Sequence, residues 1–218
     1  MEPLRRRLPT GKAPEAKVLD RDATSALLEQ ITGTYRPAVL LAVACGLRRG
    51  EIVALKWRNV DLDTATITVT EATVPLRRAT HTGATKSGRT RTITMPALVA
   101  AELRQHRLAM AERLLALGDR LSGEHHVVAH ENGRPVNPMV LTAWCRRRFG
   151  KLHGLRHTHA SQLLGAGVNI KAVSSRLGHS SAALTLSTYA HLLPGADQDA
   201  AQRIDDLLSG SKRVANQP

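Results

Sequence analysis

Aromatic residues and cysteines are scarce in this chain. Phe, Trp and Tyr make up 2% of its 218 residues, so a buried core must be built from aliphatic side chains. Ala and Leu are strong helix formers, and a core rich in them favours helices. The two cysteines, Cys45 and Cys145, are too few for a metal site of their own. They also do not indicate the disulfide framework of a secreted domain.

Long apolar segments are absent as well. The arginines at 5–7 are followed by Pro and Gly rather than by the apolar core of a signal peptide. The longest strongly apolar run, 37–45, is far too short to cross a bilayer. We therefore expect a cytoplasmic protein with no membrane partner.

Acidic residues are few compared with basic ones. Lys and Arg number 31 against 18 Asp and Glu, which gives a formal net charge of +13. An excess of this size usually indicates a polyanionic partner, because each phosphate neutralised releases condensed counterions. A basic protein that is merely soluble is the alternative that charge alone leaves open.

Hydrophobic periodicity predicts a mainly α fold with a small antiparallel β-sheet. Asp20 is expected to cap a first helix that carries leucines and an isoleucine on one face. Further helices are expected at Pro37–Gly46, Arg49–Leu55, Pro96–Leu117, 138–149, 154–165, 169–177, 181–190 and 197–209. A short strand is expected at Val127–Val128, before a turn.

Strand-like alternation replaces the helical pattern between residues 57 and 95. Ile67 and Val69 alternate with threonines, which predicts the first of two or three short strands. Gly83 and Gly88 are expected to mark the turns between these strands.

The residues that carry chemistry concentrate between His153 and His191. Breaking a phosphodiester without a metal requires a nucleophile, cations that hold the non-bridging oxygens, and an acid for the leaving oxygen. His153 and Arg156 are three residues apart, which places them on one side of a helix. Tyr189 is one of only two tyrosines and supplies a nucleophile, and His179 lies at a helix junction before it. This segment therefore favours covalent chemistry on DNA.

Each candidate also has an ordinary alternative. Arg48 follows a helix-ending glycine and is typical of a solvated arginine, although Glu51, one turn further on, could hold it by an ion pair. Lys86, taken alone, is an ordinary lysine of a turn between strands. Tyr189 is equally typical of a partly buried core tyrosine.

Neither a metal nor any other cofactor is expected at the His-rich turn. His157 and His159 are predicted to lie on other helix faces than His153 and Arg156. No carboxylate or cysteine nearby completes a ligand set.

Taken in sequence order, these motifs resemble those of the tyrosine recombinase family, the phage-type integrases. The resemblance covers roughly residues 18–194. It rests on Gly46-Leu47-Arg48-Arg49-Gly50-Glu51, Thr85-Lys86-Ser87-Gly88-Arg89, His153-Gly154-Leu155-Arg156-His157, Leu177-Gly178-His179 and Tyr189-Ala190-His191. Any one of these is a weak signal, whereas all of them in order are highly specific. The resemblance implies the catalytic-domain fold of that family.

The resemblance also implies six catalytic residues, which are Arg48, Lys86, His153, Arg156, His179 and Tyr189. The tyrosine would attack phosphorus and form a 3′-phosphotyrosine link. The two arginines would clamp the scissile phosphate, and the lysine would protonate the 5′ leaving oxygen. The first histidine would assist proton transfer, and the second would hydrogen-bond the phosphate. A second 5′-hydroxyl would then rejoin the strands without ATP or metal.

The implied partner is double-stranded DNA, bound by a homotetramer, and no small-molecule substrate is expected. The helix expected at 197–209 would join neighbouring protomers, or it would pack within its own chain. The expected organisation is a basic tail or linker at 1–17, the catalytic domain at 18–194, and a C-terminal helix and tail at 195–218. The N-terminal core-binding domain of the family is expected to be absent.

Two local departures from the family pattern bear on activity. Gly154 stands where many relatives have Asp, and the run 146–152 reaches His153 sooner than in relatives. A misplacement of about an ångström can cost orders of magnitude in rate. The expected absence of the core-binding domain and the shortened segment make a DNA-binding remnant that has lost turnover one rival to the recombinase. A topoisomerase-like DNA relaxer is another. A helix-turn-helix regulator would explain the charge, but it gives no reason for Arg48, Lys86 and Tyr189 to coexist.

Overall fold

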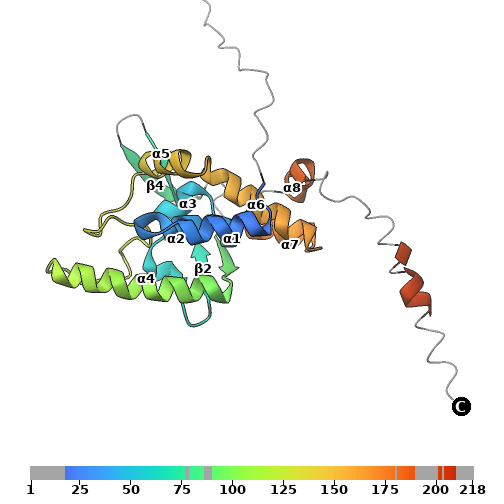
Figure 1. Ribbon diagram of the computed structural model, residues 1–218, viewed down its shortest axis with the longest axis horizontal. Coiled ribbons are helices and arrows are strands. Elements are labelled where there is room, and N and C mark those ends of the chain that lie inside the picture. The colour runs from blue at the N-terminus through green and yellow to red at the C-terminus, as the bar shows by residue number, and fades with distance from the viewer. Residues whose placement is uncertain are drawn as a thin grey trace, which may run out of the picture. The chain divides into compact units, whose positions relative to one another are not determined.

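The computed structural model describes residues 18–76, 79–85, 90–179, 181–189, 201–202 and 204–209. The chain divides into an N-terminal unit that ends at His159 and a C-terminal unit that begins at Ala160. Both contain helices, and the strands belong to the N-terminal unit (Figure 1). Within the described residues, no helix is long and apolar enough to cross a membrane.

The first three helices begin and end close to where the sequence predicts. Helix α1 spans Arg21–Gln30, and the Asp20 side chain accepts a hydrogen bond from the Ala23 N–H at 2.8 Å. Helix α2 spans Arg36–Cys45 and ends at Gly46, whose φ of 69° is the left-handed conformation that glycine adopts without strain. Helix α3, Arg49–Ala54, follows at once. The segment between α2 and α3 is therefore a sharp, well-defined turn.

The described residues of the N-terminal unit form two small antiparallel sheets, with more strands than the two or three predicted. The three-stranded sheet has the order β1-β2-β5, with β1 at Val60–Asp61, β2 at Thr66–Val69 and β5 at Arg91–Thr94. The two-stranded sheet pairs β3, Glu71–Pro75, with β4, Thr80–Ala84. The predicted alternation is confirmed on β2, where Ile67 and Val69 are buried.

The prediction of a turn at Gly83 was wrong. Gly83 lies inside β4, where it pairs with Ala72 of β3. The chain reverses earlier, where the Leu76 N–H donates to the Ala79 carbonyl at 2.8 Å. No Gly, Pro, Asn or Asp lies between Leu76 and Ala79, so the usual turn signal is missing there. Gly88, the other predicted turn, lies outside the described residues.

The strand predicted at Val127–Val128 also did not form. Both valines are fully buried, as their apolar character requires. The pairing around them consists of two isolated bridges, Lys56 with His126 and Ala129 with Pro135. Because each bridge has a different partner segment, no continuous ladder extends across the valines.

Two longer helices also belong to the N-terminal unit. Helix α4 spans Ala97–Ala116 and packs against α2, while α5 spans Pro138–Arg148. The predicted aliphatic core is confirmed, since the largest fully buried side chains include Leu40, Leu41, Ile52, Leu103 and Leu141.

Helix α6, Leu152–Gly165, runs from the N-terminal unit into the C-terminal unit. The C-terminal unit continues with α7, Ile170–Leu177, and α8, Ala182–Tyr189. Its small core consists of Ala160, Leu164, Val173, Leu177 and Tyr189. Residues 201–202 and 204–209 are helical, within the last helix that the sequence predicts.

Gly50 allows α3 to pack directly on β3, and we expect Gly50→Ala to be destabilising. A Cβ at this position would lie 2.7 Å from the carbonyl oxygen of Thr73, a backbone atom of a paired strand. Since α3 or β3 would have to shift, the free energy of unfolding should fall by about 1–3 kcal/mol. Urea unfolding of both proteins measures this loss.

The matched control for Gly50→Ala is Gly165→Ala at the end of α6. A Cβ on Gly165 meets nothing within 4 Å. This variant should keep or slightly raise the stability, because alanine favours helix over glycine by about 1 kcal/mol. Equal losses in the two variants would contradict the steric explanation.

Candidate functional site

Arg48 is held at the turn between α2 and α3 by Glu51. The Glu51 carboxylate accepts a hydrogen bond from the Arg48 backbone N–H at 2.8 Å and from Arg48 Nη1 at 2.9 Å. The predicted ion pair is thus confirmed. The Arg48 side chain remains 39% exposed, so its guanidinium is both anchored and accessible.

Arg91, at the start of β5, also binds the Glu51 carboxylate. Arg91 Nη1 donates to Glu51 Oε1 at 2.9 Å, and Nη2 donates to Oε2 at 2.7 Å. Burial by itself would raise the pKa of Glu51, but the hydrogen bonds and charges of Arg91 and Arg48 outweigh it and lower that pKa. Glu51 is therefore an anion at neutral pH. Sequence reasoning missed Arg91, because its partner lies 40 positions away and no local pattern links them.

Arg156 lies on α6 and is only 2% exposed. Its Nη1 donates a hydrogen bond to the carbonyl oxygen of Gly46, two residues before Arg48. On the same helix, Nδ1 of His159 lies 3.0 Å from the Val43 carbonyl oxygen. These two hydrogen bonds join the first half of α6 to the end of α2. Arg156 thus contacts the same α2–α3 turn that carries Arg48.

His153 and His157 contact each other on α6. Their ring centroids are 4.6 Å apart and their planes stand at 85°, an edge-to-face arrangement. The prediction that His157 lies on another face than His153 was wrong, because residues four apart on a helix are neighbours. His159 does lie elsewhere, buried against α2.

The electrostatic surroundings of His153 keep its ring neutral. Partial burial, and then the charges of His157, Arg156 and Arg48, lower the pKa of His153 to about 4. The arginines thus act on His153 directly, and at neutral pH its imidazole is a proton acceptor. Burial, with the charge of Arg156, also lowers the pKa of His157.

These shifts predict a pH dependence of stability. Between about pH 4 and its ordinary pKa of about 6.5, His153 is mostly protonated in the unfolded chain but mostly neutral in the folded one. The free energy of unfolding should therefore rise with pH from about 4 to about 6.5. We expect His153→Gln to flatten this slope, which urea unfolding at a series of pH values measures. An unchanged slope in the variant would contradict the assignment to His153.

His179 and Tyr189 belong to the C-terminal unit. Helix α7 ends at Gly178, with φ of 65°, and His179 follows directly. His179 Nδ1 lies 2.7 Å from Thr185 Oγ1, and Thr185 is fully buried one helical turn before Tyr189. Sequence reasoning missed this threonine, although its spacing from the tyrosine was visible. Tyr189 is 4% exposed and packs in the small core of this unit.

The structure therefore brings three of the six predicted residues together in the N-terminal unit, namely Arg48, His153 and Arg156. His179 and Tyr189 lie in the C-terminal unit. His179 contacts Thr185, which lies on α8 one helical turn before Tyr189. Lys86 lies outside the described residues.

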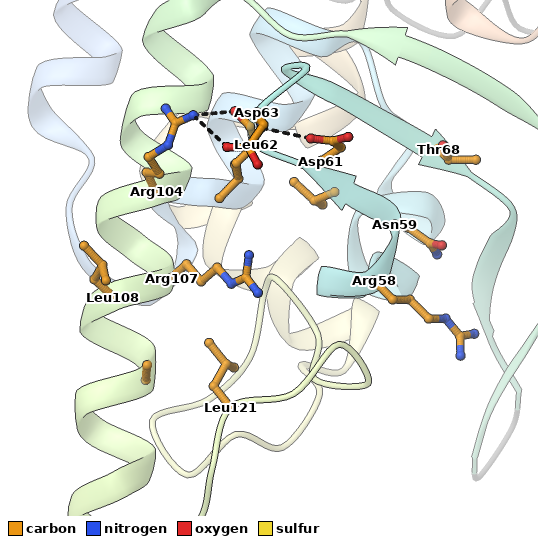
Figure 2. A pocket seen from close by; sticks show the side chains of 12 residues that line it. Arg58, Asn59, Asp61, Leu62, Asp63, Thr68, Arg104, Arg107, Leu108 and Leu121 are labelled. Carbon is orange, nitrogen blue, oxygen red and sulfur yellow. Dashed lines mark hydrogen bonds and ion pairs between the residues drawn. The ribbon is translucent and has the colours of Figure 1, made fainter.

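A wide hollow of about 910 Å³ lies elsewhere on the N-terminal unit, between β1 and α4 (Figure 2). Arg104 donates there to the Leu62 carbonyl and pairs with Asp63 at 3.8 Å. The Arg107 guanidinium stacks 5.6 Å over the ring of Trp57. These arginines are engaged with the protein itself, and the hollow shares no lining residue with the predicted site.

The model of the phage integrase family matches residues 17–195. The chain belongs to this family. The match runs through the turn that carries Arg48, the start of α6 and the helix that ends in Tyr189. Membership in the tyrosine recombinase family, which the motifs suggested, is thereby confirmed.

Curated members of the family align along most of the chain. It is 27% identical over 189 residues to a "Tyrosine recombinase XerC-like" protein of Caldanaerobacter subterraneus, covering 78% of this chain and 48% of that protein. It is 26% identical over 190 residues to the "ICEBs1 integrase" of Bacillus subtilis, covering 84% of this chain and 51% of the relative. The chain thus spans about half the length of these relatives.

Solved structures of integrases share the fold. The integrase of transposon Tn1549, in complex with a circular intermediate DNA, matches with a TM-score of 0.69 at 20% identity, over 90% of this chain and 68% of that one. The catalytic domain of bacteriophage HP1 integrase matches with a TM-score of 0.56 at 21% identity, over 86% and 95%. The predicted fold class, mainly helical with small antiparallel sheets, is confirmed.

Proposed function

We propose that this integrase-family chain cleaves and rejoins DNA strands at specific sites through a 3′-phosphotyrosine intermediate. The observation that carries the proposal is the pair of arginines at the α2–α3 turn. Arg48 is anchored by a buried carboxylate, and Arg156 reaches the same turn from α6. Guanidinium groups bind two phosphate oxygens at once and stay charged, as a scissile phosphate requires.

In the proposed reaction the Tyr189 hydroxyl oxygen attacks phosphorus, and the bond from phosphorus to the 5′ oxygen breaks. Arg48 and Arg156 balance the charge that builds on the non-bridging oxygens. Neutral His153 is suited to accept the tyrosine proton, and Lys86 is proposed to protonate the 5′ oxygen. A 5′-hydroxyl of a second strand then reverses these bond changes and frees the tyrosine. One phosphodiester is exchanged for another, so no ATP is consumed.

His179 is proposed to donate a hydrogen bond from Nε2 to the phosphate. Its Nδ1 lies 2.7 Å from the Thr185 hydroxyl, which can donate to that nitrogen. Because a neutral imidazole carries one proton, a donor at Nδ1 leaves the proton on Nε2. Thr185 thus supports the tautomer that the proposed role needs.

Double-stranded DNA is the proposed partner, and the net charge of +13 favours it. The Tn1549 integrase, which shares the fold, was itself solved with DNA. We further propose that four copies assemble on DNA through the C-terminal helical residues. Ile204, Leu207 and Leu208 support this, since they are 54%, 71% and 64% exposed.

A suicide substrate tests the proposed activity. A nicked duplex from DNA flanking the gene would lose a short fragment on cleavage, which traps the covalent complex. After incubation in EDTA, a denaturing gel should show a protein–DNA adduct. Binding of the same duplex without an adduct would favour the DNA-binding remnant. Relaxation of supercoiled plasmid without exchange of strands between duplexes would favour the topoisomerase-like reading.

A further inference from the structure

The Glu51 carboxylate is saturated with hydrogen bonds. Its Oε1 accepts from Arg48 Nη1 and Arg91 Nη1, and its Oε2 accepts from the Arg48 backbone N–H and Arg91 Nη2. The Glu51 side chain is 2% exposed. A carboxylate bound in this way has a single orientation, and that orientation sets where Arg48 is held.

Arg91 is more buried than Arg48, the other arginine seen to bind Glu51. It opens β5, and its backbone pairs with Val69 of β2 inside the three-stranded sheet. Its side chain is 13% exposed, against 39% for Arg48, and it grips both carboxylate oxygens at once. Arg48 is therefore fixed to the sheet through Glu51, although α3 itself is a helix of only six residues.

Arg91 also affects the charge that Arg48 presents. Glu51 and Arg48 alone would form a neutral pair, which would weaken attraction to a phosphate. With Arg91 included, the three side chains carry a net charge of +1. Arg91 thus offsets the negative charge of Glu51, and the more exposed guanidinium of Arg48 keeps its attraction for an anion.

We propose that Arg91 is a positioning residue for strand cleavage, which acts through Glu51 to orient Arg48 and to preserve its charge. This inference rests on the proposed function. It assigns no contact with DNA to Arg91 itself.

The test compares single-turnover cleavage of the suicide substrate by wild type and Arg91→Ala, with DNA affinity measured separately. We expect cleavage to slow by about 10- to 100-fold, because a small displacement of a catalytic group has effects of that size. DNA affinity should change little. Arg104→Ala is the matched control, since it removes an arginine of the same unit that pairs with the exposed Asp63 and lines a hollow that does not include Glu51. Its cleavage rate should equal that of wild type.

Three further measurements separate positioning from general structural damage. Arg91→Lys keeps the charge but not the paired donors, and it should recover only part of the rate. Millimolar guanidinium should partly rescue Arg91→Ala. In a Glu51→Gln background, removal of Arg91 should add little further loss, because both residues act on one carboxylate. If Arg91→Ala does not fold, the cleavage rate of Arg91→Lys tests the role of Arg91, and a melting curve shows that this variant is folded. A wild-type rate in folded Arg91→Lys would then refute the role.

The outcomes distinguish two failures. If wild type cleaves and Arg91→Ala cleaves equally fast, the role of Arg91 is refuted while the proposed function stands. Additive losses for Arg91 and Glu51 would also refute it. If wild type binds the duplex but forms no adduct, the proposed function fails, and the inference about Arg91 fails with it.

Discussion

Tyr189→Phe is expected to abolish the covalent protein–DNA adduct. Phenylalanine keeps the ring in the small core of the C-terminal unit but lacks the hydroxyl that would attack phosphorus. Loss of a nucleophile lowers rates by about 10⁴-fold or more, which is below detection on a denaturing gel. Gel-shift measurements should show that DNA binding persists, because only one hydroxyl is removed.

Tyr35→Phe provides the matched control for this variant. Tyr35 is the other tyrosine of the chain, and its ring packs 4.9 Å from that of Trp144. Loss of its hydroxyl should leave adduct formation unchanged. Adduct at wild-type level in Tyr189→Phe would rule out Tyr189 as the nucleophile.

Glu51→Ala is expected to lower the free energy of unfolding by about 3–5 kcal/mol, the range for breaking a buried ion pair from one side. The variant leaves Arg91, which is 13% exposed, without its carboxylate, and the backbone N–H of Arg48, the residue before α3, loses its acceptor. Urea unfolding at neutral pH measures the loss. Because the pKa of Glu51 is lowered, its contribution is complete above about pH 4.5 and disappears as pH falls through the folded-state value.

Glu124→Ala is the control that isolates burial. Glu124 also binds two cations, Lys56 at 2.9 Å and Arg58 at 2.5 Å, but its side chain is 61% exposed. Water and salt screen exposed ion pairs, so this variant should lose little stability. Equal losses for Glu51→Ala and Glu124→Ala would contradict a special role for the buried carboxylate.

Local signals in the sequence predicted the helices of this fold well. The Asp20 cap and the left-handed Gly46 each depend on a single residue and its immediate neighbours, and both are found as expected. The aliphatic core follows from composition. The short strands were harder, because β3 and β4 are joined at a reversal that lacks turn residues, and Gly83 gave a misleading signal.

In the candidate site, too, contacts between residues close in sequence could be predicted, and contacts between distant segments could not. The pairing of Arg48 with Glu51 was predicted because the residues are one turn apart. The bonds from Arg91 to Glu51 and from Arg156 to Gly46 join segments 40 and 110 positions apart, and only the fold reveals them. The contact of His153 with His157 was visible in principle from its spacing, which was misjudged.

The most direct test of covalent catalysis is to identify the residue that carries the DNA. The trapped adduct would be digested with nuclease and protease, and the nucleotide-bearing peptide sequenced by mass spectrometry. We predict a nucleotide joined through its 3′-phosphate to the Tyr189 oxygen, with no metal required during the reaction. A nucleotide on Tyr35 or on any other residue, or binding of the cognate DNA with no adduct at all, would contradict the proposed mechanism.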